Sequence, residues 1–503
     1  MPAHPTEEQA SQATPRVPWR RIIGYAMGHG APSLTLNGIY TYAMLYYTQA
    51  RGLPFSVAGV AFAVASFWDA IVDPAIGHVS DNTRSRWGRR HPYILVGGVA
   101  MALSFYLIWA VPPFVVRGGH FVPYFILINL AYRTAFAVFN IPFAALGFEV
   151  CTDYLQRSQL QGVGMAVSML TSVLGPSLGW ILFFSDHGTG GREATSVVAN
   201  FLHMGTVFAV ASVVFTVVAL VATRRYMRTT APAAGKPGNG LGAIYRDSGR
   251  IISNRYLRPV LIFFCIGQTG SILLSMVQIY LYVYFMHLSA VQKAIVHGGT
   301  LVMAGGGALV AVRLARKFDK KYTVCIGAAI AAGACLLAVI LFLGGSLQPG
   351  TIWMVGGRDV PIAVIVFGAC NMLNWFGVGI YQATAWSMVA DVAEVNELRS
   401  GLRQDGGHAA VFAFSYKLVI SLGTVLSSAC LAAAGFVNGS DRQTLRALHG
   451  LLFLGFGLGA CFSFLVIPVA LRYRISREFM ARVKFDLALR KSSAPAAAGP
   501  SVA

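Results

Sequence analysis

Charged side chains are scarce in this sequence. Only 12% of the 503 residues are charged, 56% are hydrophobic, and the mean hydropathy is +0.61. Soluble domains carry about 25% charged residues, so the composition excludes an ordinary soluble protein and indicates a chain that crosses a membrane many times. Negatively charged residues are the less common, with 19 Asp and Glu against 39 Lys and Arg. Most basic residues fall in segments that we predict to face the cytoplasm, which is the positive-inside pattern and argues against a nucleic-acid partner.

The sequence also lacks the motifs of several enzyme classes. Its seven cysteines show no paired or metal-type spacing, and no cluster of His, Cys and Asp suggests a metal enzyme. No Gly-rich loop carries the phosphate-binding G-x-x-x-x-G-K-S/T pattern, so ATP is not implied. The N-terminus has no apolar core with a cleavage site, so we expect no removable signal peptide. We predict that the chain is not an enzyme, uses no cofactor and holds no metal beyond a coupling Na⁺.

Apolar runs of spanning length dominate the rest of the chain. They predict an all-α polytopic membrane protein of about twelve helices, six on each side of a polar linker. The runs fall near 24–49, 55–79, 93–114, 122–149, 159–185, 199–223, 258–287, 295–315, 323–345, 360–390, 407–436 and 447–471. The predicted organisation is a disordered tail at 1–20, a bundle at 21–223, a basic linker at 224–258, a second bundle at 259–473 and a basic tail at 474–503.

The stretch 67–95, FWDAIVDPAIGHVSDNTRSRWGRRHPYIL, places two carboxylates in the second apolar run. Asp69 and Asp73 are four residues apart, so a helix presents them on one face, one turn apart. An ionised carboxylate near the bilayer centre costs roughly 2.5–3.5 kcal/mol, and two on one face also repel each other. Such a pair requires a cation, a proton or a basic side chain. The arginines that follow (Arg84, Arg86, Arg89 and Arg90) indicate a cytoplasmic loop.

This stretch carries a family resemblance. W-D-A-x-x-D-P-x-x-G followed by T-R-S-R-W-G-R-R-x-P-Y-I-L closely resembles the sodium/melibiose permease and its relatives, the glycoside–pentoside–hexuronide:cation symporters of the major facilitator superfamily. The resemblance implies the major facilitator fold with two six-helix halves, alternating access, and binding of a coupling cation, H⁺ or Na⁺, by Asp69 and Asp73. The alternative for this acid pair is a purely structural ion pair, or one acid that lies at the helix end.

The resemblance extends to the eleventh span and to the polar stretch before it. Lys417, within VFAFSYKLVIS, falls at the intramembrane lysine of the family, where it is expected to balance Asp69 and Asp73 when the cation is absent. The alternative is a lysine that reaches the membrane surface from near a helix end. The stretch DVAEVNELRSGLRQ matches the D-x-x-x-x-x-E…G-x-R segment. With the arginines of the first basic loop it predicts a cytoplasmic gate that includes Asp391, Glu394 and Arg403.

The sugar-binding set of the family is largely replaced here. Asn140 and Ser33 stand where melibiose permease has sugar-binding aspartates, which makes a galactoside less expected. Further replacements are Ala144 for a tryptophan, Met165 for an arginine, and Ala137 for a hydroxyl that binds sodium in the relative. Tyr381 and Gln382 fall opposite an aromatic pair of the relative's tenth helix. We therefore predict that Ser33, Asn140, Tyr381 and Gln382 contact the solute.

Arg133 has no counterpart in the family pattern. Its spacing from Asn140, seven residues, places both side chains on one helix face. A guanidinium stays charged and needs an anion. One hypothesis is that Arg133 binds an anionic group of the substrate, such as a uronate. The alternatives are a structural pair with Asp69 or Asp73, or an arginine that reaches the outer interface.

Together these observations predict a secondary transporter of the inner or plasma membrane, with both termini in the cytoplasm. Its substrate would be a sugar, a glycoside or a uronide-like solute, its partner the lipid bilayer, and its functional unit a monomer. Two alternatives remain open at this stage. The replaced sugar site suits an amphipathic or lipid-like solute, and the same fold serves a membrane sensor that transports nothing.

Overall fold

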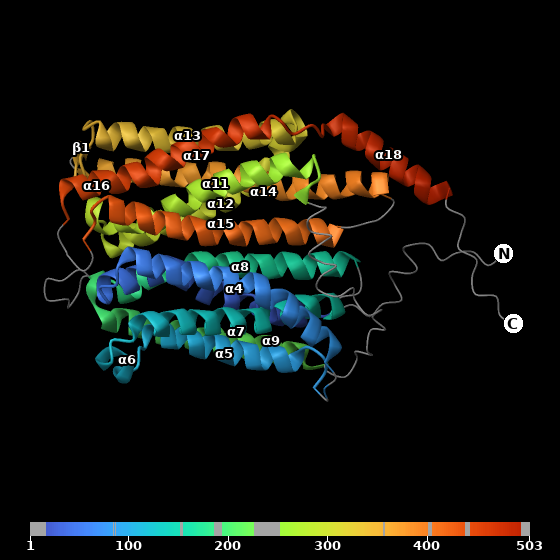
Figure 1. The fold of residues 1–503 in the computed structure, drawn as a ribbon, viewed down its shortest axis with the longest axis horizontal. Helices are drawn as coiled ribbons and strands as arrows, with labels where there is room; N and C mark the ends of the chain where they lie inside the picture. Colours follow the sequence, from blue (N-terminus) through green and yellow to red (C-terminus); the bar gives the residue numbers. More distant parts are fainter. Residues whose placement is uncertain are drawn as a thin grey trace. The chain divides into compact units, whose positions relative to one another are not determined.

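The computed structural model describes residues 17–493, with gaps at 84, 86, 151–153, 186–193, 226–251, 356–357, 401–404 and 438–442. Most of the predicted tail at 1–20 and most of the predicted linker at 224–258 therefore lie outside the described residues, as do residues 494–503 of the predicted tail at 474–503. Helices account for nearly all the structure of the described chain (Figure 1).

Long helices follow the apolar runs of the first half. They are α2 (Trp19–Met27), α3 (Gly30–Leu45), the π-helical turn η1 (Tyr46–Ala50), α4 (Phe55–Asn82), α5 (His91–Trp109), the short α6 (Pro113–Arg117), α7 (Phe121–Val150), α8 (Tyr154–Phe183), the 3₁₀ turn η2 (Ala194–Ser196) and α9 (Val198–Thr223). Because lipid offers no hydrogen bonds, a chain that crosses a membrane satisfies its backbone within such helices.

The second half repeats this pattern. Its elements are α11 (Leu257–Tyr280), the π-helical turn η4 (Leu281–Phe285), α12 (Ala290–Phe318), α13 (Lys320–Leu343), β1 (Trp353–Val355), β2 (Arg358–Val360), α14 (Ile362–Ser400), α15 (Asp405–Ala433), α16 (Leu445–Leu452), the π-helical turn η5 (Phe453–Gly457), α17 (Leu458–Ala470) and α18 (Arg477–Ser493). The two strands form an antiparallel hairpin in which Trp353 is opposite Val360.

Eleven helical segments within the described ranges are long and apolar enough to cross a membrane. The remaining predicted span is the first run, near 24–49. The structure divides it between α2 and α3 at Gly28 and His29. Pro32 in the first turn of α3 explains the division, because it has no N–H to continue the hydrogen-bond ladder of α2. The other eleven runs each match a spanning segment.

The chain divides into two compact units. The described residues of unit 1 fall within Met1–Lys236, Met276–Gly298 and Thr424–Leu451, and those of unit 2 within Pro237–Ser275, Gly299–Gly423 and Leu452–Ala503. In unit 1, α5 runs beside α7 and α9 (Figure 1). Trp109 lies at its core, stacked on Phe201 with centroids 5.9 Å apart and edge-on to Tyr46 at 5.3 Å.

Unit 2 has its own apolar core. Phe264, Val324, Tyr381, Phe412 and Val466 are buried together in it, and they come from five different helices. The 39-residue helix α14 runs through this unit. At 1.5 Å per residue it is about 58 Å long, roughly twice the thickness of the hydrocarbon core of a bilayer. One end of α14, which carries Asp391, therefore extends beyond the membrane.

Candidate functional site

A buried ion pair joins α4 to α7 inside unit 1. The Nη1 atom of Arg133 donates to Oδ2 of Asp69 at 3.0 Å, and the two side chains are only 6% and 10% exposed. Both residues lie in spanning segments, where an unpaired charge is costly. The structure therefore brings Arg133 to the partner that one alternative named, although 64 residues separate the two in the sequence.

Neighbouring contacts fix the position of this pair. Nη2 of Arg133 donates to the hydroxyl of Tyr40 at 3.3 Å, and the guanidinium carbon lies 5.6 Å from the centre of the Tyr40 ring. Trp68 precedes Asp69 in the sequence and Thr134 follows Arg133, and Nε1 of Trp68 donates to Oγ1 of Thr134 at 2.9 Å. This second bond joins the same two helices one residue from the ion pair, so it holds α4 and α7 in the register that brings the charges together.

Asp73 lies one turn further along α4 than Asp69. Asp73 is half-buried, whereas Asp69 is only 7% exposed. The two carboxylates thus share a helix face, as predicted, but differ in environment. Asp69 is enclosed beside a permanent cation, and Asp73 is more accessible from outside the protein.

A row of small polar side chains joins α3 to α8. The hydroxyls of Ser33 and Ser168 are 2.6 Å apart, and Nδ2 of Asn37 donates to Oγ of Ser172 at 3.0 Å. All four residues are half-buried. Sequence reasoning singled out Ser33 but missed Ser168 and Ser172. Their spacing could have revealed them, because each helix contributes two polar residues four positions apart, and such residues share one helix face.

The remaining first-half predictions differ in exposure. Asn140 is half-buried on α7 and Ala137 is buried. Met165 is 64% exposed on α8, one turn from Ser168.

Unit 2 contains the other predicted solute contacts. Tyr381 is fully buried, and its hydroxyl lies 2.8 Å from Oγ of Ser271 and donates to the carbonyl of Gly267 at 3.0 Å. Gln382 and Lys417 are half-buried, on α14 and α15 respectively. In this conformation Tyr381 therefore joins α14 to α11 within the core of unit 2, and its role in solute binding stays a prediction.

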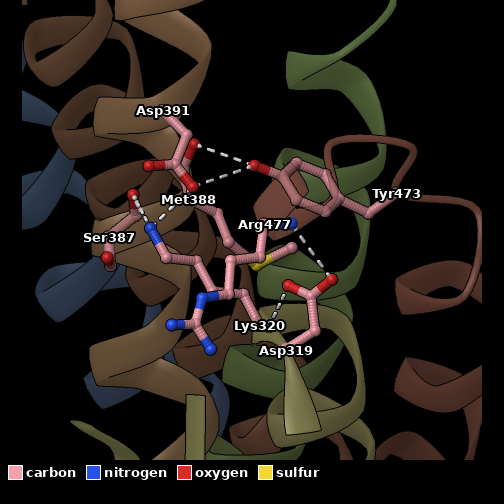
Figure 2. Close-up of polar contacts among 7 residues, drawn as sticks. All are labelled: Asp319, Lys320, Ser387, Met388, Asp391, Tyr473 and Arg477. Carbon is pink, nitrogen blue, oxygen red and sulfur yellow. Dashed lines mark hydrogen bonds and ion pairs between the residues drawn. The ribbon is translucent and has the colours of Figure 1, made fainter. Parts of the chain in front are cut away.

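Asp391 is the centre of a polar cluster at the far end of α14. Its Oδ2 accepts a hydrogen bond from Nζ of Lys320 at 2.6 Å, and the hydroxyl of Tyr473 lies 3.5 Å away on another side (Figure 2). Burial raises the pKa of Tyr473, and the Asp391 carboxylate raises it further. The phenol therefore stays protonated and remains a donor. The cluster joins α13, α14 and the segment after α17.

A cavity of about 460 Å³ opens beside this cluster. Apolar residues such as Ala311 of α12, Ala383 of α14 and Met480 of α18 form about half of its lining, and polar or charged residues form the rest. One of these, Arg477, donates its backbone N–H to Asp319 at 3.3 Å and Nη1 to the carbonyl of Arg316 at 3.1 Å. The first helical turn of α18 is thereby attached to the α12–α13 loop.

The other predicted gate residues are only partly described. Arg84, Arg86 and Arg403 lie outside the described residues. In the loop between α4 and α5, Arg90 is buried and Arg89 is half-buried, while Glu394 is half-buried on α14. Lys320, the first residue of α13, is the residue that pairs with Asp391.

Two π-helical turns meet within unit 1, one from each half of the sequence. Oγ1 of Thr48 in η1 lies 2.8 Å from the hydroxyl of Tyr280, and the hydroxyl of Tyr284 in η4 donates to Oε1 of Gln49 at 2.8 Å. Phe436 packs edge-on against both tyrosines, at 5.4 and 5.2 Å. Sequence reasoning missed this contact. The paired tyrosines at the ends of both helices, YYTQA and YLYVYF, were the available signal.

No group of three or more His, Cys, Asp and Glu side chains comes together within the described ranges. The carboxylates of α4 nevertheless have the chemistry to hold a small cation, since hard cations prefer oxygen ligands. One of the two, Asp69, already has a guanidinium as its partner.

Comparison with known proteins places these features in a family. The family model described as "MFS/sugar transport protein" matches residues 24–477. An uncharacterised symporter of Synechocystis sp. is 25% identical over 94% of this chain and 97% of its own length. The isoprimeverose transporter of Lactiplantibacillus pentosus is 23% identical over 88% of each chain. The glucuronide carrier protein homolog of Escherichia coli is 23% identical over 86% of this chain and 87% of its own.

Solved structures give the same fold. A bacterial homolog of the human lysosomal transporter Spinster, in an inward-facing and unoccupied conformation, superposes with a TM-score of 0.64 at 12% identity, covering 94% of this chain and 99% of that chain. A nucleoside transporter, NupG, superposes with a TM-score of 0.61 at 10% identity, covering 89% and 98%. These likenesses, together with the family match over residues 24–477, confirm the predicted all-α major facilitator fold.

Proposed function

The chain belongs to the MFS/sugar transport protein family, and we propose that it is a cation-coupled symporter for a sugar, a glycoside or a uronide-like solute. As a member of this family it is a multi-pass membrane transporter and not an enzyme, and the predicted resemblance is confirmed. It would be located in the inner or plasma membrane, with both termini in the cytoplasm, as the distribution of basic residues indicates.

The observation that carries this proposal is the acid pair on α4. Asp69 is 7% exposed and Asp73 is half-buried, and both lie in a segment long enough to cross the bilayer. An ionised carboxylate on this helix face is costly in a low-dielectric medium. A cation or a proton that binds there removes that charge and lets the loaded protein change conformation. The coupling ion is H⁺ or Na⁺.

The row of hydroxyl and amide groups between α3 and α8 supports a sugar-like solute. Ser33 and Asn37 face Ser168 and Ser172 across hydrogen bonds of 2.6 and 3.0 Å, and exchange of these bonds for solute hydroxyls costs little. Asn140 adds a half-buried amide on α7. Relatives named as an isoprimeverose transporter and a glucuronide carrier support the same solute class. A role for Arg133 in binding a uronate requires the guanidinium to leave Asp69.

Alternating access supplies the transport step. The contacts of Thr48 with Tyr280 and of Gln49 with Tyr284 act as the outer closure, and the pair Lys320–Asp391 acts as part of the inner gate. Opening one set while the other is formed exposes the site to one side of the membrane at a time.

Uptake into proteoliposomes with imposed ion gradients tests the proposal. Neutral pentosides, glucuronides and their aglycones are offered with an inward Na⁺ gradient, an inward proton gradient or neither. We expect one gradient to drive accumulation of a glycoside, and Asp73→Asn to abolish accumulation while downhill exchange persists. The matched control is Asp486→Asn, an exposed carboxylate outside the spans. Equal uptake by all variants under every gradient refutes the symporter.

A lipid-like solute is the second candidate, and exposed apolar residues favour it. Met165 and Met169 on α8 are 64% and 44% exposed on either side of Ser168. Competition by a lysophospholipid, but not by glycosides, in the same uptake assay would select this candidate over the first.

A further inference from the structure

We propose that the cavity beside Asp391 binds an anionic phospholipid of the cytoplasmic leaflet. Its phosphate would lie at Arg316 and Arg477, and the start of an acyl chain would lie between α12 and α14. This inference goes beyond the proposed function, because the lipid stays bound to unit 2 and is not the transported solute. It holds for any solute that the protein carries.

The cavity has the size and the two-part lining of a site for an amphipathic ligand. Its volume of about 460 Å³ falls within the roughly 300–1,000 Å³ of small-molecule sites. Along α12 the lining changes from Ala308 to Arg316, and along α14 it changes from Ala383 to Asp391. The ion pair of Asp391 with Lys320 joins the polar ends of these two rows. An apolar part and a charged part therefore follow each other in one cavity within unit 2.

The two carboxylates of the lining are already engaged by the protein (Figure 2). Asp391 accepts from Nζ of Lys320 at 2.6 Å and has the hydroxyl of Tyr473 3.5 Å away. Asp319 accepts from the backbone N–H of Lys320 at 2.7 Å and from that of Arg477 at 3.3 Å. These contacts compensate the negative charges that would otherwise repel a phosphate. Three cationic side chains stand against two carboxylates in the lining, so its balance is positive.

Arg316 and Arg477 supply the anion-binding groups. Nη1 of Arg477 donates to the carbonyl of Arg316 at 3.1 Å, which brings the two residues together where α18 meets α12. This contact uses one of the five N–H donors of the Arg477 guanidinium. Among the described residues, Arg316 contacts α18 through its carbonyl, and its side chain lies at an exposed position. Guanidinium groups bind phosphate oxygens in pairs, so two adjacent arginines suit a phosphodiester.

The apolar part of the cavity favours a lipid over a free phosphate. Ala308, Ala311 and Ala315 are three and four residues apart, so they share one face of α12, and their small side chains leave room for a hydrocarbon chain. Val312 also lines the cavity, yet it is 54% exposed, and Leu309 is 73% exposed. Both lie in a segment long enough to span the membrane, so the cavity is continuous with apolar surface that faces lipid.

The side of the membrane favours an anionic headgroup. The end of α12 is rich in basic residues, with Arg313 and Lys317 beside Arg316, which indicates a cytoplasmic position. The cytoplasmic leaflet carries anionic lipids, and basic pockets between spanning helices on that side bind their headgroups. The bound lipid would bridge the α12–α13 loop and α18 through its phosphate, in addition to the bonds that Arg477 already forms there.

Native mass spectrometry of the purified full-length protein, titrated with dioleoyl phosphatidylglycerol or dioleoyl phosphatidylcholine, measures the affinity for the first bound lipid. We expect phosphatidylglycerol to bind more tightly. Arg316→Gln should weaken it about fivefold and Arg316→Gln/Arg477→Gln about thirtyfold. The matched control, Arg313→Gln/Lys317→Gln, removes two exposed charges from the same helix end outside the cavity and should change it less than about twofold.

A second pair of variants separates a lipid from a free anion. Ala315→Leu fills the apolar part of the cavity and keeps every charge, so it should weaken phosphatidylglycerol about as much as Arg316→Gln. Ala329→Leu, at an exposed position of α13 outside the cavity, is its control. Unchanged binding in Ala315→Leu, or displacement of phosphatidylglycerol by inorganic phosphate alone, overturns the lipid site.

Equal affinity for the two lipids also overturns the inference, as does an equal loss in the cavity pair and in the control pair of basic residues. Arg316→Gln keeps the backbone bond to Arg477, so it decides even if the double variant fails to fold. Failure of the symporter proposal looks different, since it leaves ion gradients without effect on uptake whatever lipid the protein binds.

Discussion

Removing one member of the buried pair Asp69–Arg133 should destabilise the protein far more than removing both. Asp69→Asn leaves a guanidinium without its anion, and Arg133→Gln leaves a carboxylate without its cation. The Arg133 side chain is 6% exposed and that of Asp69 is 10% exposed, so either remaining charge is buried. Breaking a buried pair on one side typically costs about 3–5 kcal/mol. The double variant replaces the two charges with two amides, which can still form a hydrogen bond.

The magnitude follows from the separation of the two groups. At 3.0 Å and an effective dielectric constant of about 20, Coulomb's law gives an attraction of about 5 kcal/mol. Much of this attraction is offset by the cost of removing both charges from water. We therefore expect each single variant to lose about 3–5 kcal/mol in the free energy of unfolding and the double variant to lose less than about 2 kcal/mol. The coupling energy would then be at least about 4 kcal/mol.

Unfolding of the detergent-purified protein, induced by heat or by sodium dodecyl sulfate and followed by tryptophan fluorescence, measures all four corners of this cycle. Arg117→Gln controls for the loss of a positive charge at an exposed site. Additive single effects, with a coupling energy below about 1 kcal/mol, would refute the reasoning, because they would mean that the two charges do not depend on each other.

Three further outcomes test the packing and the two gates. In α12, Gly307→Ala would place a methyl group against a backbone carbonyl of α14 and should cost about 1–3 kcal/mol in unfolding free energy, whereas Gly306→Ala next to it meets open space and should stabilise the helix by about 0.5–1 kcal/mol. Lys320→Gln removes a partly exposed ion pair and should lower the free energy of unfolding by about 1 kcal/mol, as measured by thermal unfolding. Lys317→Gln, at an exposed position, should change that free energy by less than about 0.5 kcal/mol. Tyr280→Phe removes a buried bond at the outer closure and should cost about 1 kcal/mol, with faster labelling of a cysteine placed behind that closure; unchanged labelling would contradict its role.

The positions of the spanning helices follow from short-range properties of the sequence. A run of about twenty apolar residues has one low-energy option in lipid, which is a helix that satisfies its own backbone. For this reason the runs near 199–223 and 323–345 match α9 (Val198–Thr223) and α13 (Lys320–Leu343) within a few residues. The break between α2 and α3 was local as well. Its cause is Pro32, in the first turn of α3.

The candidate site was only partly accessible to the same reasoning. Asp69 and Asp73 are on one helix, so their shared face follows from the helical repeat. The row on α3 and α8 required pairing two helices whose polar residues are 135 positions apart. The bonds from η1 to Tyr280 at the end of α11 and to Tyr284 of η4 required contacts over 232 and 235 positions. Lys320 and Asp391 meet over 71 positions. Periodicity gives the face on which a side chain lies, and it does not give the helix that faces it.

The sequence by itself determined the class of the protein, the place of its helices, the acid pair on α4 and the family to which it belongs, because composition and motifs act within one helix or one loop. Only the tertiary structure decided which charges are neutralised inside the protein. The permanent charge of Arg133 is compatible with binding a substrate anion, with reaching the outer interface and with pairing with Asp69, so the sequence could not choose among them. The packing of α7 against α4 gave it Asp69, since a buried guanidinium is stable only where a second helix supplies an anion.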